Sequence, residues 1–229
     1  MGVVIGDALR NKKSKLYLLI STSIAVLITS ALQYIISLKL FNFDIIKDSI
    51  KLMRNSYEEM IKTTEKMTGQ SPISTDQLNQ LFDTMNTMIP GAITIATVFI
   101  SFIVISVNLP LLKRLKVEVP KFDKFKSMRL PKSVLWYYLI VLVITLFVKP
   151  DEGTALYVII LNFSLVLWVL LALQGLSLIF YIIEAYNLPS FIKVLSVIFA
   201  IPFYSFALFL GILDIGFNLR TFIAGKMKK

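Results

Sequence analysis

Long apolar runs with few polar interruptions form the dominant pattern of the chain. The clearest of them, residues 154–183, carries no charged side chain over thirty positions. About 20 helical residues cross a hydrocarbon layer about 30 Å thick, so this run is long enough to span a bilayer as one helix. The pattern predicts an all-α polytopic membrane protein. Its five expected transmembrane helices are residues 16–38, 91–112, 134–148, 154–183 and 189–217.

The third and fifth of these runs are less regular than the others. Residues 134–148 are short, and Trp136 with the two tyrosines after it forms an interfacial belt at one end. Residues 189–217 contain Pro202 near the middle, which removes a helix hydrogen bond. Non-helical backbone at membrane depth has to be buried in protein or line a cavity. The fifth span is therefore a candidate for two half-crossings.

Residues 39–90 form the sizeable region outside the predicted spans, with six basic and seven acidic residues. Apolar side chains recur there at spacings of three and four, which predicts amphipathic helices at residues 43–67 and 75–88. Ser74 and Gln77 have the spacing of a capping box at the start of the second helix. We expect an extracytoplasmic helical hairpin. Three roles remain open for it: a spacer, a docking surface or a lid over the bundle.

Basic residues gather beside the apolar runs. Residues 1–15 are basic, and residues 113–132 hold eight Lys and Arg against Glu118 and Asp123. The positive-inside tendency predicts that both segments are cytoplasmic. Each cation near an anionic leaflet contributes about 1 kcal/mol, so the loop at 113–132 is expected to bind anionic lipid of the bilayer. The formal charge of +10 is explained in this way, and no nucleic-acid partner is expected.

The basic tail, residues 218–229, does not fit the count of five spans. A cytoplasmic start and five crossings would leave this tail on the outer side, where basic residues are disfavoured. Either the last span is split or re-entrant, or the tail is an exception to the rule. The side of the membrane on which the C-terminus lies stays open, as does the oligomeric state.

The chain contains neither cysteine nor histidine. This composition excludes thiolate and imidazole nucleophiles and the usual zinc and haem ligands. Carboxylates remain as candidates for acid–base chemistry, namely Glu184 at a helix end and Asp214 within the last span. Neither has a second acid at a useful spacing. We therefore expect no enzyme activity, no metal site and no cofactor.

Polar residues are rare within the predicted spans, and in lipid such groups face other helices. The expected residues of the bundle interior are Asn108, Asn162, Gln174, Asp214, Asn218 and Arg220. Among them, Asp214 is the acid that lies well inside an apolar span. An ionised carboxylate at the centre of an inserted helix costs roughly 2.5 to 3.5 kcal/mol, so Asp214 should have a partner.

The partner of Asp214 depends on where the last helix ends. If this helix is continuous, several small and polar residues share one face with Asp214: Ser196, Ala200, Tyr204, Ala207, Gly211 and Asn218. Asn218, four residues on, is then the expected neighbour. Arg220 lies six residues on, about 600° around the helix axis. Arg220 and Asp214 therefore pair only if the helix ends between them.

Three separated motifs resemble those of one family. They are the stretch FDKFKSMRLPKSVLWYYL, the Gln174-Gly175 pair, and Pro202 followed by GILDIGFNLR. On these motifs the chain resembles the YybS family of predicted bacterial multi-pass membrane proteins, which implies a location in the bacterial cell membrane. The family is similar in membrane architecture to the substrate-binding S components of energy-coupling-factor vitamin transporters. The resemblance thus implies a small-molecule substrate without defining it.

The chain departs from the family pattern in two places. Family members usually carry an additional multi-span region before the position that matches Gly2. The resemblance therefore implies that this chain is a fragment or begins at an internal methionine. Members also usually have an acidic residue where Asn218 stands.

Three functions remain open, in this order of preference. The first is a component of a transport system, with a substrate pocket between helices near the midplane. The second, ranked nearly equal, is a non-catalytic interaction or scaffold protein that recruits a membrane protein partner through the hairpin and the basic loop. The third is a membrane enzyme, for which the two carboxylates named above are the candidates.

Overall fold

The structure, a computed structural model, describes residues 2–120 and 123–226. Every regular element in these two ranges is helical, which confirms the prediction of an all-α protein. The chain divides into two compact units by its internal contacts. The first unit is Met1–Pro120 and the second unit is Lys121–Lys229.

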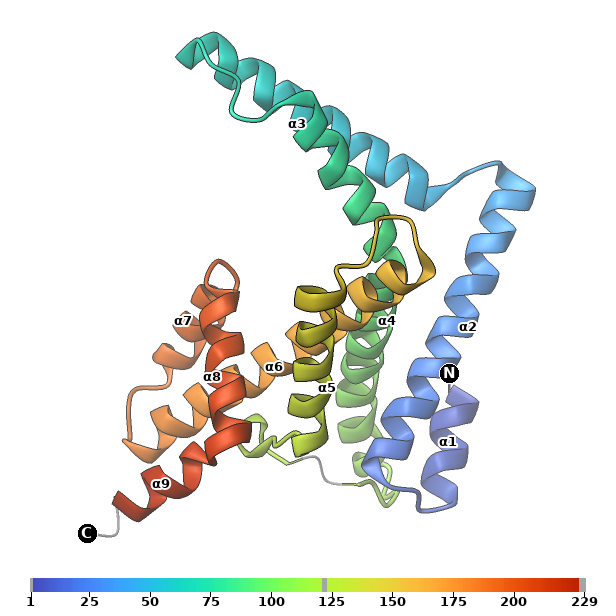
Figure 1. Ribbon diagram of the computed structural model, residues 1–229. Coiled ribbons are helices and arrows are strands. Elements are labelled where there is room, and N and C mark those ends of the chain that lie inside the picture. Colours follow the sequence, from blue (N-terminus) through green and yellow to red (C-terminus); the bar gives the residue numbers. More distant parts are fainter. Residues whose placement is uncertain (1, 121–122, 227–229) are drawn as a thin grey trace. The chain divides into compact units, whose positions relative to one another are not determined.

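Two long helices dominate the first unit. Its described part contains α1 (Gly2–Arg10), α2 (Lys15–Phe41), α3 (Ile45–Thr68) and α4 (Thr75–Arg114). Helices α2 and α4 lie side by side and run in opposite directions, and α1 packs against α2 (Figure 1). A small apolar core joins the three helices and consists of Ile5, Ala8, Leu18, Ile105 and Leu109.

A helical hairpin follows α2, as the amphipathic pattern of the sequence predicted. Helix α3 begins after its N-cap Asp44, whose carboxylate accepts a hydrogen bond from a backbone N–H of the first turn. Ser74 and Gln77 form the predicted capping box at the start of α4, with the Gln77 N–H donating to Ser74 Oγ at 3.2 Å. Across the hairpin, the rings of Tyr57 and Phe82 pack edge to face, with their centroids 5.9 Å apart.

Helix α4 is longer than the sequence indicated. We expected a helix that ends before Pro90 and a separate span at residues 91–112, yet α4 runs unbroken through Pro90 and Pro110. A proline inside a helix removes one hydrogen bond and favours a bend. Packing on both sides of Pro90 outweighs this cost, since buried residues precede and follow it: Leu78, Phe82, Thr97, Ser101 and Ile105. The second arm of the hairpin and the second span are therefore one helix.

The capping box provides a test of the hairpin. Replacing Ser74 by alanine should destabilise the start of α4 by about 1 kcal/mol, because the Gln77 N–H loses its acceptor. Hydrogen exchange of the backbone amides in this first turn should become about five-fold faster. Ser56→Ala in the middle of α3 is the matched control, because Ser56 donates to the Leu52 carbonyl and caps no helix end. Unchanged exchange in the Ser74 variant would contradict the cap.

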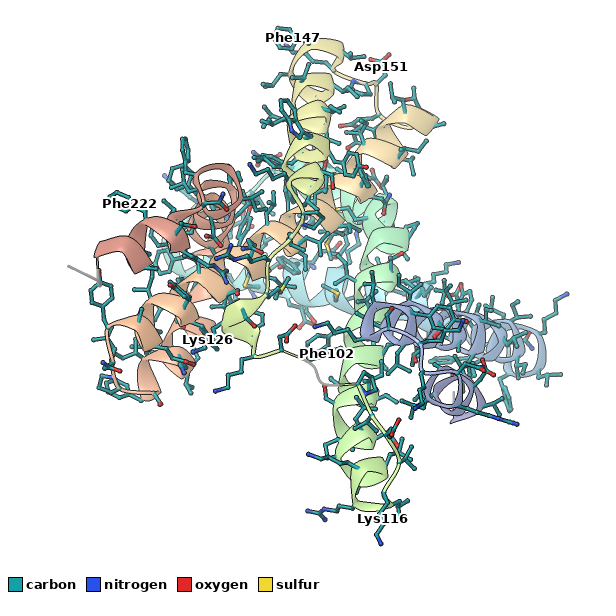
Figure 2. All side chains as sticks on the ribbon, turned by 90° about the horizontal axis from the view of Figure 1, so that it is seen from below. Phe102, Lys116, Lys126, Phe147, Asp151 and Phe222 are labelled. Carbon is teal, nitrogen blue, oxygen red and sulfur yellow. The ribbon has the colours of Figure 1, made fainter. Side chains whose placement is uncertain are left out.

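The second unit is built on the pairing of α6 (Ala155–Ala185) with α8 (Tyr204–Phe217), its most extensive helix contact. Its other described elements are η1 (Phe125–Ser127), α5 (Lys132–Val143), η2 (Ile144–Val148), α7 (Phe191–Ala200) and α9 (Leu219–Lys226). The apolar core consists of Val134, Val141, Leu167, Leu171 and Ile215. Figure 2 shows Phe147 and Asp151 together at the far end of the α5–η2 segment.

Three helices of the described residues are long and apolar enough to cross a membrane: α2, α4 and α6. The pair α7 and α8 adds a fourth span if it is counted as one broken helix, with a bend of 109° at the break. The α5–η2 segment, Lys132–Val148, is apolar but shorter. By length and composition the described residues thus contain three candidate spans, or four with the broken pair, and the crossing expected at residues 134–148 stays a prediction.

The break in the last apolar segment lies where Pro202 led us to expect it. Helix α7 ends at Ala200 and α8 begins at Tyr204. The expected continuous face from Ser196 to Asn218 therefore does not form. Within α8 its central part is retained, since Ala207, Gly211 and Asp214 are all buried.

Candidate functional site

Helices α6 and α8 approach each other backbone to backbone at two glycines. A Cβ placed on Gly175 of α6 would lie 1.8 Å from the Ala207 carbonyl oxygen of α8. A Cβ on Gly211 of α8 would lie 1.9 Å from the Leu171 carbonyl oxygen of α6. The contact is thus reciprocal, and only glycine fits on either side. Small residues permit this close approach in membrane helix pairs, where lipid provides no hydrophobic driving force between helices.

One turn beyond this crossing, Asp214 of α8 forms a buried ion pair with Arg220. Helix α8 ends at Phe217, and Asn218 adopts a left-handed conformation with φ of 50° while its N–H donates to the Asp214 carbonyl. This turn ends α8 and changes the direction of the chain, so that Arg220 Nε lies 2.9 Å from Asp214 Oδ2. Asp214 is 5% exposed and Arg220 is 2% exposed. The condition for their pairing, a helix end between them, is therefore met.

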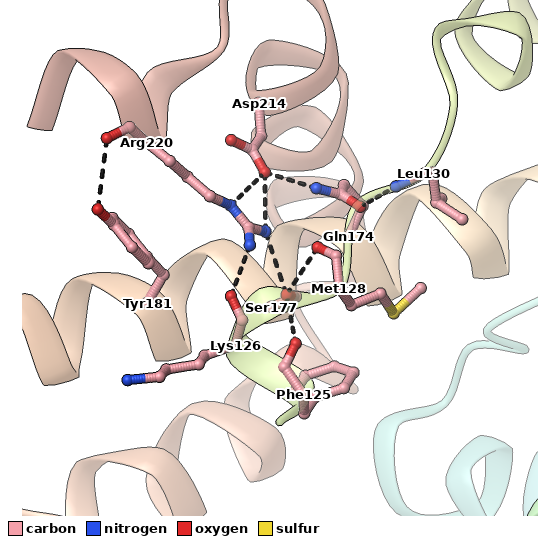
Figure 3. Close-up of polar contacts among 9 residues, drawn as sticks. All are labelled: Phe125, Lys126, Met128, Leu130, Gln174, Ser177, Tyr181, Asp214 and Arg220. Carbon is pink, nitrogen blue, oxygen red and sulfur yellow. Dashed lines mark hydrogen bonds and ion pairs between the residues drawn. The ribbon is translucent and has the colours of Figure 1, made fainter. Parts of the chain in front are cut away.

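Two polar side chains of α6 complete the site. Gln174 donates through Nε2 to Asp214 Oδ2 at 2.5 Å, and Arg220 donates through a terminal nitrogen to Ser177 Oγ at 3.1 Å. Both α6 residues are buried, at 2% and 0% exposure. We call the group of Asp214, Arg220, Gln174 and Ser177 the Asp214 network (Figure 3).

Backbone groups of the segment before α5 provide further hydrogen-bond partners for this network. Arg220 donates to the Lys126 carbonyl at 2.5 Å, and Ser177 donates to the Phe125 carbonyl at 2.6 Å. Gln174 Oε1 accepts from the Leu130 N–H at 2.9 Å. The network therefore fixes an irregular segment of the chain onto α6 (Figure 3).

The ring of Tyr181 borders the network on one side. The Arg220 guanidinium lies 5.6 Å from the centroid of the Tyr181 ring, within the range of a cation–π contact. The phenol of Tyr181 donates to the Arg220 carbonyl at 3.4 Å. Arg220 is thus held through its side chain and its backbone.

The structure brings three of the six expected interior residues together: Gln174, Asp214 and Arg220. Asn218, the expected partner of Asp214, is exposed and acts through its backbone as the turn after α8. Asn162 lies elsewhere on α6, is half-buried and donates to the Val158 carbonyl at 2.8 Å. Asn108 belongs to the first unit, where its side chain is half-buried.

Sequence reasoning missed Ser177 and the backbone groups between residues 125 and 130. Ser177 follows Gln174 by three residues and so lies on the same face of α6. That spacing was the signal that could have identified Ser177. The backbone partners have no such signal, because any residue type supplies a carbonyl and most supply an N–H.

Glu184, the second acid that we considered for chemistry, lies near the end of α6 between two lysines. Its carboxylate accepts from Lys126 Nζ and, at 2.7 Å, from Lys193 Nζ of α7. All three side chains are about two-thirds to three-quarters buried, with exposures of 33%, 25% and 32% for Lys126, Lys193 and Glu184. Both candidate carboxylates are therefore paired with cations, and Glu184 joins α7 to the segment before α5.

Long apolar helices, a broken last span and an ion pair buried among helices define an all-helical polytopic membrane protein. A family profile described as "Predicted membrane protein (DUF2232)" matches residues 1–215, and the chain belongs to this family. It is 28% identical over 226 residues to the "Uncharacterized protein YybS" of Bacillus subtilis (strain 168), an alignment that covers 96% of this chain and 72% of that protein. The resemblance expected from the motifs is thereby confirmed. No solved structure matches the chain.

Proposed function

We propose that this membrane protein is a non-catalytic component of a small-molecule transport system. The observation that carries the proposal is the broken pair α7–α8, bent by 109°, with a buried ion pair on its second half. Discontinuous helices near a polar site are a recurring feature of transporters, where they line the substrate pathway. Ionisable residues inside a membrane span are also concentrated at functional sites.

The two halves of the broken span are held very differently. Helix α8 is fixed by the glycine crossing and by the Asp214 network. Helix α7 has no buried residue, and Lys193 ties it to Glu184 of α6 at 2.7 Å. We infer that α7 moves about the break at residues 201–203 while α8 stays in place, and that the Lys193–Glu184 pair holds the closed position. A broken span with one rigid half and one mobile half is suited to open and close access to a fixed site.

A second candidate, an interaction protein, is favoured by the surface of α3. None of the residues of this helix is buried, and Leu52, Met60 and Met67 are each more than half exposed. An apolar stripe of this kind suits contact with another protein or with the bilayer surface. We rank it second because it explains neither the broken span nor the buried ion pair.

The transport proposal predicts that protein purified from its native membrane carries an enriched small molecule. Lys193→Met removes the ion pair that holds α7, so the amount of this molecule per protein should fall several-fold. The amount of bound small molecule per protein is measured by mass spectrometry after denaturation releases it. Lys132→Met, a change of the same kind at an exposed residue outside the broken span, is the matched control and should leave the amount unchanged.

If no small molecule is enriched over an unrelated membrane protein purified in the same way, the transport proposal fails. A photo-crosslinker at Met60 then tests the second candidate. Capture of one membrane protein from intact cells, lost when Leu52 and Met67 are both changed to serine, would assign the protein to the interaction class.

A further inference from the structure

A hollow of about 380 Å³ opens in the first unit between α1 and the end of α4. Its volume is in the range of small-molecule and lipid-headgroup sites. The apolar part of its wall comes from Ile5 and Leu9 of α1, Leu112 of α4 and Val117. Arg10, Lys12 and Glu118 supply its charged rim. The hollow belongs to neither the Asp214 network nor the broken span.

Helix α1 forms this hollow because its apolar face is only partly covered. Ile5 and Ala8 are buried against α2 and α4, in the small core that also contains Leu18 and Ile105. Gly6 lines the hollow, and a Cβ at Gly6 would have no heavy atom within 4 Å. The space beside Gly6 is therefore open, and an apolar chain of a ligand has room to lie along α1.

The hollow lies beside the ends of two candidate membrane spans. Span α2 begins at Lys15 and span α4 ends at Arg114, and these two ends are adjacent because the helices run in opposite directions (Figure 1). Lys116 extends from this same end of α4 (Figure 2). Basic residues that flank apolar spans lie among lipid headgroups. The hollow thus faces headgroups with its rim and acyl chains with its wall.

Cations outnumber acids in the two chain segments next to the rim. The segment that joins α1 to α2 and the segment at the end of α4 contain seven basic residues: Arg10, Lys12, Lys13, Lys15, Lys113, Arg114 and Lys116. The acids of these segments are Asp7, which accepts from Asn11 at 2.9 Å, and Glu118. The field at the rim is therefore strongly positive, and an anionic group is the complement.

Glu118, the acidic residue of the rim, forms an ion pair with Lys12. Lys12 Nζ lies 2.8 Å from Glu118 Oε2, and both side chains are about four-fifths exposed, at 78% and 80%. The hydrogen bond that Lys12 donates to Glu118 raises the pKa of Lys12 and lowers the pKa of Glu118. Lys12 is thus charged at neutral pH. An exposed pair of this kind is weak, so an anion at the rim competes for Lys12 with little cost.

From these observations we infer that the hollow is a binding site for one anionic phospholipid, with the phosphate at Arg10 and Lys12 and an acyl chain along Ile5 and Leu9. Apolar walls beside a cationic rim at headgroup depth match the two halves of such a lipid. Free inorganic phosphate offers the same anion without the chain. A test must therefore separate the contribution of the rim from that of the wall.

Native mass spectrometry of the full chain in detergent, with phosphatidylglycerol or phosphatidylcholine added, measures the bound lipid. We expect one phosphatidylglycerol to be retained in preference to phosphatidylcholine. Arg10→Gln and Lys12→Gln should each lower its affinity about five-fold, since each cation near anionic lipid contributes about that factor. Glu118→Gln should raise the affinity about as much, because it removes an acid and frees Lys12.

Two matched controls separate this site from diffuse charge and from general effects of substitution. Lys62→Gln removes one cation from the exposed face of α3, and Gly225→Leu enlarges a helical glycine with open space around it in the second unit. Both should leave lipid retention unchanged. Gly6→Leu should lower it by occupying the space beside α1. Arg10→Lys keeps the charge and should retain most of the affinity, which would assign the loss in Arg10→Gln to the missing charge. Thermal unfolding of Arg10→Gln in detergent, unchanged from that of the unmodified chain, shows that this variant is folded.

Three results would overturn the inference. Equal loss of lipid in the Lys62 and Arg10 variants would show binding by net charge alone. Full retention in Gly6→Leu, together with displacement of phosphatidylglycerol by inorganic phosphate at roughly 10 mM, enough to fill a weak site with a Kd of about 1 mM, would assign the rim to free phosphate. Equal retention of phosphatidylcholine and phosphatidylglycerol would remove the anionic site.

Discussion

Gly211→Ala is expected to separate α6 from α8 and to cause a large loss of stability. The added Cβ would lie 1.9 Å from the Leu171 carbonyl oxygen and 2.8 Å from its carbonyl carbon. These are backbone atoms of a helix, so no side chain can rotate away and the two helices have to move apart. Overpacking a close contact costs up to about 3 kcal/mol and occasionally more.

The expected change of stability in Gly211→Ala is opposite in sign to the usual effect of alanine in a helix. Alanine in place of glycine inside a helix is ordinarily stabilising by up to about 1 kcal/mol. Gly216→Ala, in the same helix, is the matched control, because the nearest atom to its Cβ would be Leu135 Cδ2 at an ordinary 3.7 Å. Thermal unfolding in detergent should therefore shift down for Gly211→Ala and stay or shift up for Gly216→Ala.

Gly175→Ala tests the same crossing from the other helix. Its Cβ would lie 1.8 Å from the Ala207 carbonyl oxygen, so a loss similar to that of Gly211→Ala is expected. The double variant should cost less than the sum of the two single variants, because one separation of the helices relieves both clashes. A Gly175→Ala or Gly211→Ala protein as stable as the unmodified chain would mean that α6 and α8 are not in backbone contact.

Arg220→Met is expected to have the second large effect. It leaves the Asp214 carboxylate, which is 5% exposed, with Gln174 as its remaining side-chain donor. Removing one partner of a buried ion pair costs about 3 to 5 kcal/mol, because the other charge remains buried. The Lys126 carbonyl and Ser177 Oγ also lose their Arg220 donors. Unfolding in detergent and proteolysis of the segment before α5 should both become faster.

Substitutions of Asp214 distinguish charge from hydrogen bonding. Asp214→Asn should be milder than Asp214→Leu, since an amide oxygen still accepts from Gln174 Nε2 and from Arg220. Asp214→Leu leaves the guanidinium unpaired, so it should match Arg220→Met in size. Combining Asp214→Leu with Arg220→Met removes both charges and should be less harmful than the sum of the two.

The expected double-variant recovery is incomplete, because Gln174 and the Lys126 carbonyl still lose partners. If Asp214→Leu equals the unmodified protein in detergent stability and in cellular function, the Asp214 network has neither a structural nor a functional role. If the double variant is as damaging as the sum of the single variants, the two residues act independently and the ion pair is not the source of the effect.

Local patterns determined most of the helices. The uncharged run at 154–183 predicted α6 (Ala155–Ala185) within two residues at each end. The Ser74 and Gln77 pair predicted the start of α4, and Pro202 predicted the break before α8. These features depend on residues a few positions apart, which is why periodicity, capping and proline chemistry were sufficient to find them.

Features that depend on competing local and tertiary energies were predicted less well. Pro90 indicated the end of a helix, but packing before and after it keeps α4 continuous. Pro90 was recognised correctly as a residue that disfavours a continuous helix, but the packing that outweighs it comes from residues on other helices.

The sequence by itself therefore determined that this is an all-α membrane protein, which segments are apolar, and that Asp214 needs a partner. The tertiary structure decided that this partner is Arg220. The left-handed turn at Asn218 ends α8 and changes the direction of the chain, so that the Arg220 side chain reaches Asp214, while two glycines let α6 approach closely enough for Gln174 to join them. Such contacts depend on a change of chain direction and on a backbone distance between helices, and neither is encoded by the spacing of residues along one helix.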